Sequence, residues 1–260
     1  MSIVNGAQTV GAIGHALADR DEGSDDSADA RVLVRLISLE NCPPEFGAAV
    51  TRATNTQNRI VSRDFVALDE QQERLRIELR IEGRAYALKT GDPDPAPEDG
   101  CSVVEATVAL GCADSDPQTA VQVKREIGRI WEDTESPLYR RLFNSGTTST
   151  QLWRCVQVMR VVDAEIRRMQ GTEEGRRRQV AVHGNRLILH VVFAVLADSS
   201  SEEGEPDPEY LCQQARASFE AFCQKIDSDY QGNYLASLFK NQTKCRVLVD
   251  HALDSLAPRS

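Results

Sequence analysis

The polar run TRATNTQNRIVSRDF (51–65) contains three carboxamide side chains, Asn55, Gln57 and Asn58, followed closely by Arg63. A carboxamide donates and accepts hydrogen bonds without carrying charge, so it can read an adenine edge or hold a ribose or phosphate oxygen. The nearby arginine could add a contact to an anion. The alternative is that the amides cap and tie a turn between two helices, as Asn commonly does. The sequence leaves both interpretations open.

A second polar motif, NGAQT, lies near the start of the chain. Asn5 and Gly6 form the expected turn after a short strand, and Gln8 and Thr9 open a helix. A glycine just before a helix lets the backbone approach a phosphate, which the free N–H groups of the helix N-terminus can bind. We therefore expect the two motifs to converge in one pocket, where the N–H groups of Gln8 and Thr9 hold a phosphate that Arg63 neutralises.

The sequence lacks the patterns of common catalytic sites. It contains no G-x-S-x-G, no H-E-x-x-H, no Walker-type loop and no convincing D…E-x-K nuclease set. Its seven cysteines include no C-x-x-C pair, so a zinc site is not expected. The sequence thus assigns no catalytic residue, no metal ligand and no cofactor, and it leaves open whether the protein is an enzyme.

Three other groups of polar residues have a structural interpretation that outweighs a functional one. The arginines between residues 167 and 186 could contact phosphates, but neighbouring acids favour the Arg-rich connection of a helical hairpin. The charged run 70–78 is expected to be a solvated helix face. His190 lies in an apolar stretch and is expected to be a hydrogen-bonded histidine of the core or of an interface. The arginines are Arg167, Arg168, Arg176, Arg177, Arg178 and Arg186, and the acids are Glu165, Glu173 and Glu174.

The charge is distributed unevenly along the 260 residues. Three loops rich in Gly, Pro, Ser and Asp, 19–29, 92–99 and 198–209, carry net charges of −5, −4 and −6, which leaves +5 for the rest of a chain of net charge −10. A local anion site is therefore compatible with the charge, whereas broad electrostatic capture of DNA is not favoured. No signal peptide and no long apolar run is present, so we expect a cytoplasmic protein without a membrane partner.

The hydrophobic spacing predicts an α+β fold in which a small mixed α/β lobe is followed by a larger all-helical lobe. Residues 1–91 form the mixed lobe, which carries both polar motifs and ends in a short strand near 86–89. The acidic, proline-rich segment 92–102 is the expected linker. Residues 103–260 form the helical lobe. Its expected helices are Val103–Cys112, Pro117–Trp131, Leu138–Phe143, Ser149–Met169, Gln179–Ala197, Pro208–Ile226 and Tyr234–Leu256.

Together the two polar motifs resemble the AIPR family, which is associated with abortive-infection phage resistance in bacteria. The resemblance is carried by N-G-x-Q-T and by T-N-T-Q-N-x-I-x-x-R-D-F, and the helical pieces EATVAL (105–110) and LYRRLF (138–143) are also similar to the family. It implies a role in defence and supplies no mechanism. The residues that we expect to bind a ligand, from the chemistry of the two motifs, are Asn5, Gly6, Gln8, Thr9, Asn55, Thr56, Gln57, Asn58 and Arg63. Because family members extend upstream of the first motif, the chain is expected to be the C-terminal portion of a longer protein.

Two functions follow as hypotheses. The first is an antiphage defence protein of the abortive-infection type that responds to a nucleotide or a nucleic acid. The second is an interaction module without ligand chemistry, which docks onto a nuclease lobe that is encoded upstream or separately.

Overall fold

The computed structural model describes residues 42–43, 46–47, 66–198 and 207–257. The chain divides into two units, Met1–Ile60 and Val61–Ser260. Almost all described residues belong to the second unit, so the fold given below is that of this unit. The strand, turn and helix expected around the first motif lie outside the described residues, as does the whole of the segment 48–65.

Helix α4 (Glu70–Ile81) opens the described part of the second unit. It begins after Asp69, whose side chain accepts hydrogen bonds from the N–H groups of Gln71 and Gln72 at 2.9 and 3.3 Å. Leu75 and Leu79 are buried on its inner face, as their spacing predicts, but Leu68 precedes the helix and is 71% exposed. The acceptor that caps the first turn of α4 is therefore Asp69.

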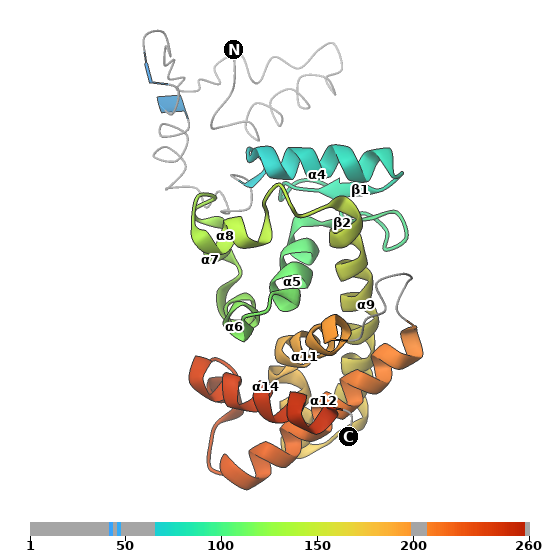
Figure 1. Cartoon of the computed structure of the whole chain (residues 1–260), viewed down its shortest axis with the longest axis vertical. Coiled ribbons are helices and arrows are strands. Elements are labelled where there is room, and N and C mark those ends of the chain that lie inside the picture. Colours follow the sequence, from blue (N-terminus) through green and yellow to red (C-terminus); the bar gives the residue numbers. More distant parts are fainter. Residues whose placement is uncertain (1–41, 44–45, 48–65, 199–206, 258–260) are drawn as a thin grey trace, which may run out of the picture. The chain divides into compact units, whose positions relative to one another are not determined.

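Two short parallel strands, β1 (Ala85–Ala87) and β2 (Gly100–Ser102), follow α4 (Figure 1). Strand β1 lies where the sequence predicts a strand, whereas β2 lies at the end of the segment expected to be a linker. A Cβ at Gly100 would lie 2.0 Å from the carbonyl oxygen of Ala85, so only glycine allows this pairing. The boundaries of the predicted domains, 1–91 and 103–260, stay predictions.

Helices dominate the remaining described residues. Together with the small sheet of β1 and β2, they give a fold that is broadly α+β but mostly helical. Residues at the helix starts explain where several helices begin. Ser102 and Glu105 form a capping box at α5, and proline occupies the first turn of α6, α8 and α12. The helices are α5 (Val103–Ala113), α6 (Pro117–Glu126), α7 (Gly128–Trp131), α8 (Pro137–Leu142), α9 (Ser149–Thr172), α10 (Gly175–His183), α11 (Asn185–Asp198), α12 (Pro208–Asp229), α13 (Leu235–Leu238) and α14 (Gln242–Leu256).

Three predicted helices are each divided in two. The expected helix 117–131 breaks into α6 and α7, and 234–256 breaks into α13 and α14, which Asn241 caps. The expected helix 179–197 becomes α10 and α11, which meet at Gly184 with a 65° bend. Gly184 is buried against the Phe239 ring, and a Cβ there would lie 2.9 Å from that ring. Tertiary contact at Gly184 therefore accompanies the break that periodicity alone did not predict.

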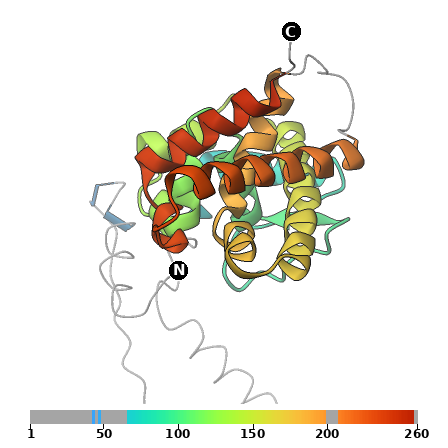
Figure 2. The ribbon, with the colours of Figure 1, turned by 90° about the horizontal axis from the view of Figure 1, so that it is seen from below.

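The core is organised around α11. This helix packs against α5, α6, α9, α12 and α14, and Figure 2 shows α12 and α14 lying side by side across one face of the unit. His190 is buried in α11, and its Nδ1 lies 3.0 Å from the carbonyl oxygen of Cys112, which confirms the predicted core histidine. Within the described ranges, no single helix is long and apolar enough to cross a bilayer; α10 and α11 meet that criterion only when joined across their bend.

Candidate functional site

The residues predicted to bind a ligand lie outside the part of the chain that the structure describes. Their convergence into one pocket therefore stays a prediction. These residues are Asn5, Gly6, Gln8, Thr9, Asn55, Thr56, Gln57, Asn58 and Arg63.

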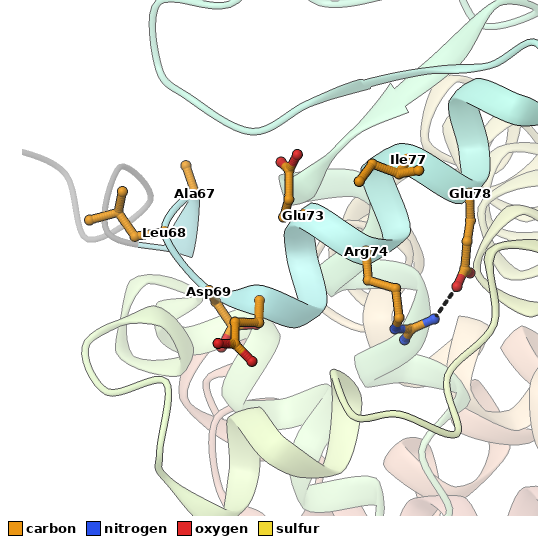
Figure 3. A pocket seen from close by; sticks show the side chains of 8 residues that line it. Ala67, Leu68, Asp69, Glu73, Arg74, Ile77 and Glu78 are labelled. Atoms are coloured by element: carbon orange, nitrogen blue, oxygen red, sulfur yellow. Dashed lines mark hydrogen bonds and ion pairs between the residues drawn. The ribbon is translucent and has the colours of Figure 1, made fainter.

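A shallow cavity of about 750 Å³ lies along the outer side of α4 (Figure 3). Its lining residues follow the second polar motif in the sequence. The cavity combines acidic side chains with the apolar side chains of Leu68 and Ile77. Figure 3 shows Arg74 and Glu78 pointing toward one another on one side of the helix. The lining residues are Ala67, Leu68, Asp69, Glu70, Glu73, Arg74, Ile77 and Glu78.

A buried hydrogen-bond network holds the inner side of α4 in place. Tyr86 of β1 donates to Gln72 Oε1 at 2.8 Å, and Gln72 Nε2 donates to the hydroxyl of Tyr139 in α8 at 3.1 Å. Burial raises the pKa of Tyr139 well above its ordinary value, so its hydroxyl stays neutral. This network and the buried Leu75 and Leu79 determine which side of α4 faces outward.

Four charged side chains of the cavity, Asp69, Glu73, Arg74 and Glu78, are engaged in ion pairs. Arg74 contacts Glu78 at 2.7 Å and also donates to the carbonyl oxygens of Asn144 and Thr147. Glu73 accepts two hydrogen bonds from Arg76, at 2.8 and 2.6 Å, and these bonds hold its pKa below the ordinary value. A carboxylate with a lowered pKa is a poor general acid at neutral pH. Glu73 is therefore poorly suited to donate a proton in this cavity.

Exposed isoleucines continue the outer side of α4. Ile77 is 49% exposed and Ile81 is 81% exposed, and the two lie one helical turn apart. We call Leu68, Ile77, Ile81 and the charged residues Glu70, Glu73 and Arg80 the α4 face. The expectation that residues 70–78 form a solvated helix face did not identify these exposed isoleucines. The helical period would have placed Ile77 on the side opposite the buried leucines, since Ile77 lies about 200° around the helix from Leu75.

The arginines flank the α9–α10 connection, at the end of α9 and in the first turn of α10, with Arg186 in α11, in agreement with the favoured prediction. Arg186 contacts Asp163, while Arg176 donates to backbone carbonyl oxygens of the loop after α12. Arg177 is paired with both Glu173 and Glu220. These partners neutralise much of the local charge, which weakens the case for a phosphate-contacting strip along the connection.

The cysteines of the helical core are unsuited to nucleophilic chemistry. Burial raises the pKa of Cys101, Cys112 and Cys245 to about 12 each, and that of Cys155 to about 11. Such thiols remain protonated at neutral pH and behave as small apolar side chains. Among the residues that the structure describes, no group of three or more His, Cys, Asp or Glu side chains is placed to hold a metal ion.

Comparison with known proteins gives one match. Residues 1–243 match the family described as AIPR protein, which is far more than half of the 260-residue chain. No curated protein and no solved structure matches the chain. The family match includes both polar motifs as well as α4 to α13 and confirms the resemblance predicted from those motifs: the chain belongs to the AIPR family.

Proposed function

We propose that this chain is an antiphage defence protein of the abortive-infection type that responds to a nucleotide or a nucleic acid. The observation that carries the proposal is the family match over residues 1–243. The two polar motifs support the finer part, because amides, a turn glycine and an arginine together suit a phosphorylated ligand.

The test is a plaquing assay in a susceptible bacterial host that expresses the full chain together with its native locus. We expect fewer plaques than in the empty host, and we expect the double variant Asn55→Ala, Gln57→Ala to restore plaquing. Protein level is checked by immunoblot, so that loss of folding is not mistaken for loss of function. Full protection by the double variant would remove the role assigned to the amides, and plaquing equal to that of the empty host would overturn the defence function.

A second candidate function, protein interaction, is supported by the α4 face. Its exposed Ile77 lies between acids in the first helical turn, Glu70 and Glu73, and a base in the last turn, Arg80, which Ile81 directly follows. An antiparallel second copy would place the first turn of one helix against the last turn of the other. Opposite charges would then flank the apolar contact. We therefore propose a second copy of this chain as the partner of the α4 face.

Light scattering after size-exclusion chromatography tests this pairing. The wild-type chain should form a dimer, and Ile77→Ser with Ile81→Ser should shift it to monomer. Val247→Ser is the matched control, because Val247 is an exposed apolar residue of α14. Arg80→Glu should weaken the dimer, and adding Glu73→Arg should restore it. A wild-type monomer at all concentrations, or a dimer that survives the isoleucine changes, would overturn the proposal.

A further inference from the structure

A group of basic side chains gathers where α6 meets the break between α10 and α11. Lys124, in α6, donates from Nζ to the carbonyl oxygen of Val182 at 3.1 Å and to Asn185 Oδ1 at 2.8 Å. An ammonium group has three donors, so these two bonds orient the lysine and leave a third donor for another partner.

Two more basic residues reach the same place from other elements. His183 is the last residue of α10, next to the Val182 carbonyl that Lys124 contacts. Lys240 follows Phe239, whose ring lies against Gly184 at the break. Lys240 is exposed, while Lys124 and His183 are half-buried, so the group is open to solvent on one side. Three separate elements thus supply its members.

Within the described part of the chain, the one acid that acts on Lys124 is already paired. This acid is Asp163, and both of its oxygens lie 2.9 Å from Arg186 Nη1. Burial lowers the pKa of Lys124, and Arg186 and Lys240 lower it further. Burial likewise lowers the pKa of His183, with added effects from Lys124 and Lys240. Neighbouring cations therefore repel one another here, and a bound anion would relieve that repulsion.

We propose that Lys124, His183 and Lys240 bind the phosphate groups of a small phosphorylated compound. Two ammonium groups and an imidazole match a multiply charged oxyanion better than a single carboxylate. The net charge of −10 disfavours a long polyanion, so we infer a compact ligand such as a nucleoside polyphosphate. None of these residues belongs to the two polar motifs. The inference thus goes beyond the proposed function and adds a separate site.

Isothermal titration of the full chain with pyrophosphate, ATP and a 20-nucleotide single strand tests the site. We expect pyrophosphate and ATP to bind. Lys240→Gln, which changes an exposed side chain, should weaken their binding about tenfold. Lys89→Gln is the matched control, because Lys89 is an exposed lysine outside this group, and it should leave the affinity unchanged. Lys124→Gln should also weaken binding, and a thermal melt shows whether its fold is intact.

A second measurement follows the His183 ring by NMR, assigned with the His183→Gln variant. Pyrophosphate should raise the pKa of His183, because a bound anion favours the charged imidazole. The site is overturned if pyrophosphate and ATP do not bind, if only the oligonucleotide binds, or if Lys240→Gln changes neither the affinity nor the pKa of His183. These results are independent of plaquing, so failure of this site and failure of the defence function are distinguishable.

Discussion

Helices α4 and α11 both carry apolar side chains on more than one side, yet only α11 has all of these sides covered. Leu187, Ile188, Leu189, Val191 and Val192 follow one another closely in α11, and all are buried. In α4, Leu75 and Leu79 are buried, whereas the isoleucines on the opposite side are exposed. Apolar content alone therefore does not decide burial; the number of packed neighbours does.

The comparison also separates two uses of polar groups. In α11, His190 is buried among apolar side chains with the Cys112 carbonyl oxygen as its partner. In α4, buried Gln72 links β1 to α8, while the charged side chains remain outside. Polar atoms in the interior fix neighbouring elements in place, whereas the charged groups of the α4 face lie outside, where Glu73 pairs with Arg76.

Ile188→Ala should have the largest effect on stability. Ile188 is fully buried in α11, a helix that packs against five others, and removing its side chain leaves a cavity in this core. We expect the free energy of unfolding to fall by about 2 to 5 kcal/mol. Urea denaturation monitored by circular dichroism measures this change. A loss below about 1 kcal/mol would contradict the view that α11 is packed on all sides.

Tyr139→Phe should have an intermediate effect, because it removes the acceptor of Gln72 Nε2 in a buried site. An unsatisfied buried donor costs about 1 to 3 kcal/mol. The same urea experiment applies. The triple variant that adds Gln72→Leu and Tyr86→Phe should recover part of the loss, since it removes all three polar groups together. A Tyr139→Phe protein as stable as wild type would show that the network does not hold α4.

Acidification should destabilise the core through His190. Burial lowers its pKa below the ordinary 6.5, although the Cys112 carbonyl opposes this shift. The unfolded chain therefore binds the proton at a higher pH than the folded chain does. Stability should fall as the pH drops below about 6.5, by at most about 1.4 kcal/mol per pH unit until the folded pKa is reached.

Urea denaturation at pH 7 and pH 5.5 measures this loss. In the variant His190→Gln the loss should be smaller, with a remainder from His183, whose pKa is also lowered. An identical pH dependence in the variant and the wild type would mean that His190 does not carry the effect.

Ile81→Ser should have the smallest effect on stability, within about 0.5 kcal/mol, because the side chain is 81% exposed. Its effect should show in dimer formation instead. If this change cost more than 1 kcal/mol in urea at concentrations where the chain is monomeric, the α4 face would be covered within the monomer. The contrast with α11 would then disappear.

Much of the helical part was predictable because helical spacing and capping are local. The positions of α5, α9 and α12 agree with their periodicity to within a few residues, and the core role of His190 was expected from its apolar neighbours. The candidate site was harder to predict. The exposed α4 face and the basic group around Lys124 depend on which elements pack together, and neither has a motif of its own.

The sequence by itself determined the family, through its two polar motifs, and the starts of several helices. Asp116, Ser136 and Asp207 each accept a hydrogen bond from the first turn of a helix whose first residue is proline, and these contacts span three residues or fewer. Only the tertiary structure decided the bend at Gly184 and the pairing of Gly100 with Ala85. These features depend on contacts between separate elements, which no local pattern encodes.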